Sequence, residues 1–404
     1  MLDTREDASL EDGRGMTASA VLPPLFITTD EELREAAGDF RSFPRLAIDT
    51  ESNGFYAWRE RVCLIQISTP ERDYIVDPLA VRDLEPLRPI LAEPAIEKVF
   101  HAGEYDVMCL KRDYGFEFEN LFDTMIAGRL LGFKELGLAK LIAAQFGVKL
   151  SKKFQKADWG QRPLSAEQVR YAQMDTHYLL RLSEVLEGRL AQAGRLDEAR
   201  EAFRDLALTE AQSKSFDPEG WWDIRGRSTA PDSALPILRD LYLFREREAE
   251  RRDRASFRIM PDHLLVRIAA AAPRTKEELA KVPGFSEYLR ARYSGKIIEI
   301  VNAARHAPSP SRSEREPARM SGRERKLLGD LKLWRKTRAE AEGLDPAAVL
   351  SGAVLRDLAS RAARGEADCL SALSPAKHRR YGAELERLLK GSGSVSSKPL
   401  NPSA

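Results

Sequence analysis

The sequence predicts an α/β domain with a mixed β-sheet, followed by two small all-α domains. Three observations lead to this fold class. The chain has 404 residues, which suits two or three domains rather than one. Between residues 25 and 204, β-rich apolar runs alternate with segments of helical periodicity. From residue 234 onward, apolar residues recur at helical spacing alone.

Breaks in composition set the expected domain boundaries. Segments rich in Pro, Gly, Ser or Arg separate the periodic regions, and the last residues are rich in Ser, Gly and Pro. We therefore expect disordered tails at 1–22 and 392–404, an α/β domain at 23–205, a connector at 206–232, helical domains at 233–306 and 323–391, and a linker at 307–322.

The net charge and the cysteine pattern limit the partners and the cellular compartment expected for this protein. The formal net charge is +1, so only local patches can argue for a nucleic-acid partner. No apolar window reaches the length of a membrane span, and the N-terminal segment lacks the pattern of a signal peptide. Cys63, Cys109 and Cys369 are far apart and lack zinc spacing, which indicates free thiols. We expect a cytoplasmic protein.

The first elements of the α/β domain have clear boundaries. Thr29 is a predicted helix N-cap, because acidic residues fill the first turn after it. The run 46–51 is a predicted strand that ends at the turn signal 52–54. Runs 62–68 and 73–77 are predicted strands, and their short connections favour an antiparallel meander.

The later elements of this domain complete the α/β pattern. Ser165 and Gln168 form a predicted capping box that begins a long helix through Leu179. The other expected elements are a helix at 84–91, a strand at 98–101, a helix at 104–114 and three helices between 125 and 147.

The two helical blocks resemble each other. Leu238, Leu241 and Phe244-Arg245 in the first correspond to Leu328, Leu331 and Trp334-Arg335 in the second, and each block has a Tyr before its closing helix. A duplication of about 70 residues is the simplest explanation.

Asp49 and Glu51 are two carboxylates at the end of a predicted strand. Residues two apart on a strand project to the same face, so these side chains would lie side by side. Paired carboxylates repel each other and cost desolvation energy unless a cation lies between them. A divalent metal site is therefore one hypothesis, and an ordinary polar strand end is the other.

Two further segments supply acids in similar settings. Asp106 lies in the first turn of a predicted helix, directly after a strand and a glycine, where an acid also serves as helix-dipole compensation. Tyr171 and Asp175 are four apart on a predicted helix and share one face, although a half-exposed helix surface explains that pair too. Together, four acids and one tyrosine suit phosphodiester hydrolysis by two Mg²⁺ or Mn²⁺ ions held in an all-carboxylate cage.

These segments resemble the three exonuclease motifs of the DEDD superfamily, in its tyrosine-containing branch. The match is Asp49-x-Glu51, His101-x4-Asp106 and Tyr171-x3-Asp175, with supporting segments at 63–68, 122–124, 157–159 and 162–164. The resemblance covers about residues 25 to 200 and implies a ribonuclease H-like fold. The helical blocks resemble HRDC domains, the second less closely, and the whole arrangement is similar to the ribonuclease D family.

The resemblance also implies roles for the site residues. Asp49, Glu51, Asp106 and Asp175 would bind two divalent metal ions, Mg²⁺ or Mn²⁺, and Tyr171 would orient the attacking water. The implied reaction is 3′-to-5′ removal of nucleotides from RNA as 5′-monophosphates, with tRNA precursors carrying 3′ single-stranded tails as the expected partner. A 3′-5′ DNA exonuclease and a non-catalytic nucleic-acid-binding protein are the alternatives, and the intact acid set argues against the second.

Several other residues have two interpretations. Asp123 is either near the site or structural, and His101 is expected to be a structural histidine at a strand end rather than a ligand. The mixed-charge run 245–254 favours a salt-bridged helix surface, and Trp221-Trp222 favours packing over base stacking. The lysines of 149–156 and the basic residues of 323–338 leave RNA contact and a solvated surface equally open.

Overall fold

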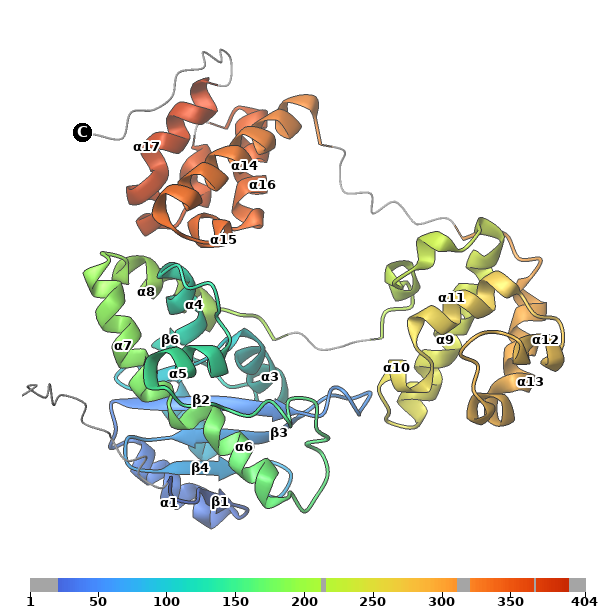
Figure 1. Ribbon diagram of the computed structural model, residues 1–404, viewed down its shortest axis with the longest axis horizontal. Coiled ribbons are helices and arrows are strands. Elements are labelled where there is room, and N and C mark those ends of the chain that lie inside the picture. Colours follow the sequence, from blue (N-terminus) through green and yellow to red (C-terminus); the bar gives the residue numbers. More distant parts are fainter. Residues whose placement is uncertain (1–20, 212–215, 311–319, 367, 392–404) are drawn as a thin grey trace, which may run out of the picture.

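The computed structural model describes residues 21–211, 216–310, 320–366 and 368–391, and Figure 1 shows an α/β domain and two helical domains. The tails expected at 1–22 and 392–404 lie outside the described residues, apart from residues 21 and 22, and so do 311–319 of the expected linker. No helix of the described ranges is long and apolar enough to cross a membrane.

The sheet of the α/β domain is mixed, as predicted. Its order is β1-β4-β3-β2-β5-β6. The pairs β2–β3 and β3–β4 are antiparallel, which confirms the meander, whereas β1–β4, β2–β5 and β5–β6 are parallel. The strands are β1 Leu25–Ile27, β2 Arg45–Ser52, β3 Val62–Ser68, β4 Asp73–Val76, β5 Glu97–Phe100 and β6 Leu121–Asp123.

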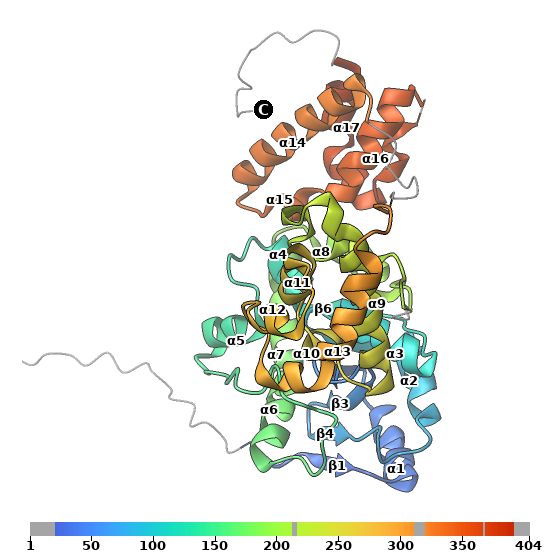
Figure 2. The ribbon, with the colours of Figure 1, turned by 90° about the vertical axis from the view of Figure 1, so that its right-hand side faces the viewer.

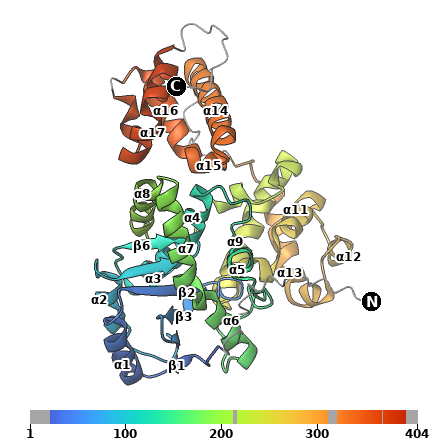
Figure 3. The same ribbon diagram turned by 60° about the vertical axis from the view of Figure 1, so that its left-hand side comes forward.

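Helices cover both faces of this sheet. Leu46 and Ile48 of β2 pack into a core with α1 and α3, whereas Ala47 belongs to a core with α7 and α8 on the other face. Figure 3 shows α6 and α7 running across the strands of the sheet. The helices are α1 Asp30–Phe40, α2 Arg88–Leu91, α3 Glu104–Tyr114, α4 Thr124–Leu130, α5 Leu138–Phe146, α6 Ala166–His177, α7 Leu179–Gln192 and α8 Leu196–Ala207.

Three predictions for these helices were wrong in detail. The expected helix at 84–91 is a 3-10 turn followed by the single turn α2, because Pro86 and Pro89 cannot donate backbone hydrogen bonds. Two helices, not three, lie between 125 and 147, since Gly132 has a left-handed φ of 76° and the chain re-enters a helix only after Gly137. The long helix from Ser165 ends at His177, where α6 gives way to α7.

Among the residues that the structure describes, the first helical domain contains five α-helices and the second contains four. They are α9 Leu235–Arg251, α10 Ser256–Ile259, α11 Asp262–Ala271, α12 Lys276–Ala280 and α13 Glu287–Ala304, then α14 Gly322–Glu342, α15 Pro346–Val349, α16 Gly352–Arg364 and α17 Pro375–Gly391. The mixed-charge run on α9 is largely ion-paired: Arg251 and Arg252 both bind Glu248, as a salt-bridged surface requires. Trp221 is fully buried, in agreement with a packing role.

Equivalent residues make equivalent contacts in the two helical domains. Arg245 Nη1 donates to the carbonyl of Met260 at 3.2 Å, and Arg335 Nη1 donates to that of Leu350 at 3.0 Å. Edge-to-face ring pairs also recur, with centroids 5.6 Å apart for Phe244–Tyr293 and 5.7 Å apart for Trp334–Tyr381. This shared side-chain geometry supports an internal duplication.

The first helical domain contacts the loop between β2 and β3. The backbone N–H groups of Trp58 and Arg59 donate to Asp253 Oδ1 at 3.1 and 2.9 Å. The Arg258 guanidinium lies 3.8 Å from the centroid of the Tyr56 ring. Figure 2 shows this domain facing the viewer in front of the sheet, with the second helical domain above.

The second helical domain contacts α8 through buried charges. Arg195 and Glu198 are each 5% exposed, and they pair with Glu342 and Lys377 of the second domain. Ala348 belongs to the same apolar core as α7 and α8. Both helical domains therefore pack against the α/β domain.

Candidate active site

The five predicted site residues lie around one cavity. Asp49 and Glu51 come from β2, Asp106 from α3, and Tyr171 and Asp175 from α6, and all five line a cavity of about 340 Å³. Strands β2 and β5 are parallel, so the end of β2 and the start of α3 after β5 meet at one edge of the sheet. Segments more than 100 residues apart in sequence are brought together in this way.

A glycine turn places Asp106 at this edge. Between β5 and α3 the chain turns through Ala102, with φ of 59°, and Gly103. A Cβ on Gly103 would lie 2.5 Å from the Cβ of Phe100, so only glycine fits there without displacement. Asp123 Oδ2 accepts the Gly103 N–H at 2.8 Å and holds the turn in place.

Asp106 is bound to the strand that carries the other acids. Its Oδ1 accepts hydrogen bonds from the Thr50 backbone N–H at 3.0 Å and from Thr50 Oγ1 at 2.5 Å. The pairing of β2 with β5 ends at Ala47, so the Thr50 N–H lies beyond that ladder. Asp106 supplies an acceptor for it and thereby becomes fixed beside Asp49 and Glu51.

Tyr171 lies one helical turn before Asp175 and has a packed ring. The ring centroids of Phe154 and Trp159 are each 6.0 Å from that of Tyr171. Burial, followed by the nearby Asp175 carboxylate, raises the pKa of the Tyr171 phenol. A neutral phenol with a fixed ring is suited to orienting a water molecule by hydrogen bonding.

Burial and mutual repulsion destabilise the ionised forms of the four carboxylates. Burial, aided by neighbouring acids, raises the pKa values of Asp49 and Glu51. Burial also raises the pKa of Asp106 to about 6 and that of Asp175 to about 7, although hydrogen bonds from Thr50 and Tyr171 oppose the shifts. None of the four forms an ion pair with Lys, Arg or His within the described ranges. Bound cations would offset the burial and mutual repulsion that destabilise the ionised carboxylates.

The donor set fits hard divalent metal ions, and exonuclease domains of this type use such ions. All four groups are carboxylates, the ligands that Mg²⁺ and Mn²⁺ prefer. Among the described residues, however, no three His, Cys, Asp or Glu side chains already converge as a closed metal cage. Like charges favour separated side chains, so the four acids surround the cavity without closing on one point.

Asp123 and His101 have structural contacts. Asp123 is 1% exposed and caps α4 by accepting the N–H groups of Met125 and Ile126, besides that of Gly103. His101 lines the cavity, and its Nδ1 lies 2.9 Å from Thr124 Oγ1. Burial lowers the pKa of His101 to about 4, so the imidazole is neutral at pH 7. Both residues support the turn that carries Asp106.

Sequence reasoning missed three residues at this site. Thr50 was overlooked because it lies between the two acids of its own motif, and Tyr105 because it is adjacent to Asp106. Tyr105 lines the cavity, and its hydroxyl donates to Glu60. Gln66 lies in a run of apolar strand residues directly opposite Asp49, and only strand pairing shows that proximity. Of the lysines at 149–156, Lys152 lines the cavity, whereas Lys153 pairs with Glu167.

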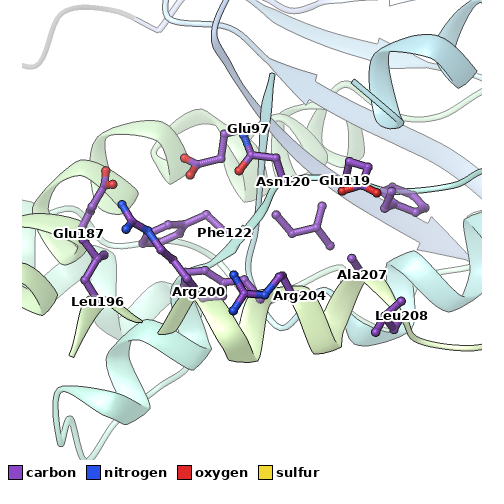
Figure 4. A pocket seen from close by; sticks show the side chains of 13 residues that line it. Glu97, Glu119, Asn120, Phe122, Glu187, Leu196, Arg200, Arg204, Ala207 and Leu208 are labelled. Atoms are coloured by element: carbon purple, nitrogen blue, oxygen red, sulfur yellow. The ribbon is translucent and has the colours of Figure 1, made fainter. Parts of the chain in front are cut away.

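A larger cavity, of about 510 Å³, lies at the opposite ends of β5 and β6. Figure 4 shows Arg200 and Arg204 on one side of it, and Glu97, Glu119 and Asn120 on the other. None of the five predicted site residues lines it. Acidic side chains and guanidinium groups both line this cavity, where a helix meets the strands. It lacks the cluster of unpaired acids that lines the candidate active site.

The fold and this site define a 3′-5′ exonuclease domain followed by two HRDC domains. Residues 24–191 match the 3′-5′ exonuclease family, and residues 234–301 and 324–389 each match the HRDC domain. The chain belongs to the ribonuclease D family and is a 3′-5′ exoribonuclease of the ribonuclease D and RRP6 type. The predicted ribonuclease H-like fold is confirmed.

Similar proteins are found among bacterial and eukaryotic ribonucleases. Ribonuclease D of Gluconacetobacter diazotrophicus is 35% identical over 72% of this chain and 75% of its own length. The exosome complex exonuclease RRP6 of Saccharomyces cerevisiae is 34% identical, but the match covers 62% of this chain and 36% of that protein.

Two solved structures support the same conclusion. The catalytic core of Trypanosoma brucei RRP6 is 34% identical with a TM-score of 0.64, over 71% of this chain and 82% of that one. Escherichia coli RNase D, described as an exoribonuclease involved in structured RNA processing, is 25% identical with a TM-score of 0.65, over 92% and 99% of the two chains.

Proposed function

We propose that this exoribonuclease hydrolyses RNA 3′ ends by a two-metal-ion mechanism and releases 5′-mononucleotides. The observation that carries the proposal is the cluster of Asp49, Glu51, Asp106 and Asp175 around one cavity, with no basic partner among the described residues. Asp106 is buried and the other three are half-buried. Like-charged groups withdrawn from water in this way are costly to a fold and are typical of cation-binding sites.

Each site residue has a distinct role in this proposal. The four carboxylates hold the ions, which would supply an activated water and neutralise the leaving oxygen. Thr50 holds Asp106 in place through Oδ1. Tyr171 orients the attacking water through its hydroxyl, because its raised pKa keeps the phenol protonated and able to donate a hydrogen bond. His101 is neutral and adds no positive charge among the acids.

We further propose that the substrates are structured RNAs with single-stranded 3′ tails, such as tRNA precursors. The similarity to an RNase D described as processing structured RNA supports this choice. Similarity to two ribonucleases, each above 30% identity, favours RNA over the alternative DNA substrate.

We propose that the first helical domain guides a single strand to the cavity. Phe55 and Phe257 are 48% and 50% exposed, and they lie next to the contact between Arg258 and the β2–β3 loop. Arg258 lies 5.8 Å from the Phe257 ring. Exposed aromatic rings beside a guanidinium group are typical of surfaces that stack nucleobases. The Tyr56 hydroxyl donates to the Lys156 carbonyl, which connects this contact to the loop beside the cavity.

The test uses matched RNA and DNA oligonucleotides labelled at either the 5′ or the 3′ end. Wild-type protein with Mg²⁺ should shorten 5′-labelled RNA stepwise and release mononucleotides from 3′-labelled RNA. Excess EDTA should stop both, and Asp49→Asn should do the same with metal present. Glu104→Gln is the matched control, because Glu104 is an exposed acid of the same helical turn as Asp106 and does not line the cavity. Full activity in EDTA would contradict the metal mechanism.

A further inference from the structure

Gln66 is a buried amide with no hydrogen-bond partner among the described residues. It lies in the middle of β3 and is 0% exposed. Neither its Nε2 nor its Oε1 has a hydrogen-bond partner within the part of the chain that the structure describes. Burying an amide without compensating hydrogen bonds is costly, and most buried polar side chains in folded proteins are paired. Packing alone therefore does not explain why this position holds a glutamine rather than an apolar residue.

The pairing of strands places Gln66 beside Asp49. In the antiparallel β2–β3 pair, Asp49 is directly opposite Gln66. Side chains directly opposite share one face of the sheet, with Cβ atoms about 4.5–5.5 Å apart. The glutamine amide and the aspartate carboxylate both extend beyond Cβ. Together the two side chains can span this Cβ–Cβ distance, so the amide can reach the carboxylate.

The neighbouring positions on β3 and β4 do not offer Gln66 a free hydrogen-bond partner. The Ser68 hydroxyl, two residues along β3, is bonded to Asp73 at 2.6 Å and to Thr176 at 2.7 Å. On β4 the residue opposite Gln66 is the apolar Ile75. Helix α6 covers this face with buried Ala172 and Thr176. Of the two residues directly opposite Gln66 on the neighbouring strands, Asp49 is therefore the one whose side chain can form a hydrogen bond with the amide.

We propose that Gln66 is a positioning residue, whose Nε2 donates a hydrogen bond to the Asp49 carboxylate when that carboxylate binds a metal ion. Carboxylates that ligate metals are commonly held by a neighbouring donor, which orients the oxygen that binds the ion. Metal binding then satisfies the amide and fixes Asp49 in one step. The inference rests on the proposed metal site and adds a residue that does not itself contact the ion.

This role predicts opposite effects on folding and on metal binding. Gln66→Met replaces the unpaired amide by an apolar side chain of similar length. In EDTA its melting temperature should equal or exceed that of wild type, because no buried amide remains unpaired. Its affinity for Mn²⁺, measured by calorimetry on the full chain, should fall roughly 10- to 100-fold. Gln66→Leu repeats the test with a differently shaped side chain.

Ser68→Ala is the matched control on the same face of β3. It removes a buried side chain that has partners, so it should lower the melting temperature and leave Mn²⁺ affinity unchanged. Unchanged Mn²⁺ affinity in a folded Gln66→Met or Gln66→Leu protein would overturn the inference and assign the amide to a buried water or to packing. If wild-type protein itself binds no Mn²⁺, the proposed metal site fails instead, which separates the two conclusions.

Discussion

Asp106 Oδ1 accepts both the backbone N–H and the hydroxyl of Thr50, the residue between Asp49 and Glu51. One carboxylate of the cluster is therefore bound directly to the strand that carries two others. This contact couples the placement of α3 to that of β2 at the edge of the sheet. The hydrogen bonds also oppose the rise in the pKa of Asp106 that burial causes.

Thr50→Val should weaken metal binding without unfolding the protein. The substitution removes the hydroxyl but keeps the backbone bond and the side-chain shape, so we expect a stability loss of about 1 kcal/mol. Mn²⁺ affinity should fall roughly 10-fold, since Asp106 loses one of the groups that orient it. Thr50→Ser keeps the hydroxyl and is the control. Equal Mn²⁺ affinities for the Val and Ser variants would show that the hydroxyl does not position Asp106.

Tyr171→Phe should reduce turnover while leaving substrate binding intact. The ring keeps its contacts with Phe154 and Trp159, and the four acids remain. We expect kcat to fall by about 10²-fold with KM nearly unchanged, as for a group that acts chiefly in the transition state. Tyr105→Phe removes a hydroxyl from the same cavity and should have a much smaller effect. A Tyr171→Phe enzyme with wild-type kcat would leave Tyr171 with a packing role alone.

The stability of the metal-free protein should decrease as pH rises. The folded-state pKa values of Asp106 and Asp175 are about 6 and about 7, above the ordinary value of 3.8. The folded state therefore holds protons that the unfolded state has released between about pH 4 and pH 7, and the free energy of unfolding falls across that window. Thermal melts in EDTA at several pH values measure this slope.

Mg²⁺ should reverse that trend, because a divalent ion replaces the protons in the acid cluster. The increase in melting temperature on adding Mg²⁺ should therefore be larger at pH 8 than at pH 5. Asp175→Asn removes one of the titrating groups and should flatten the slope measured in EDTA. A slope that is identical in wild type and Asp175→Asn would mean that Asp175 titrates normally.

Phe257→Ala should weaken the binding of single-stranded RNA. Loss of one base-stacking contact costs about 1–3 kcal/mol, so the Kd for an RNA oligonucleotide should rise by about 5- to 150-fold. An abasic nucleotide at the stacked position should weaken wild-type binding equally and have no added effect on the variant. Tyr288→Ala is the control, because Tyr288 is 55% exposed on the same domain but contacts Arg252. Additive losses at every abasic position would exclude stacking on Phe257.

Point variants test the role of the helical domains in RNA binding better than a shortened protein that ends near Arg227 and lacks both domains. Trp58 packs against the core of the first helical domain, and Ala348 of the second belongs to the core around α7 and α8. Removing both domains would expose these apolar surfaces and leave Arg195 and Glu198 without Glu342 and Lys377. A loss of RNA binding in the truncated protein would then report damage to the α/β domain as well.

The sequence by itself determined the features that depend on local spacing. The period of two in β2 placed Asp49 and Glu51 on one face, and the helical period paired Tyr171 with Asp175. The antiparallel meander followed from short connections, and the paired helical blocks followed from repeated residues. Each of these depends on residues close together in the chain or on a pattern that occurs twice.

Only the tertiary structure decided which distant groups meet. Thr50 holds Asp106, Asp123 supports the Gly103 turn, and Gln66 faces Asp49 because of strand register and helix placement. The helix ends at Leu130 and His177 also differed from the periodic pattern, because the apolar spacing continues through the turns at which the helices end. Residue spacing shows which groups share a face of one element, whereas packing between elements fixes the partner that each group finds across the fold.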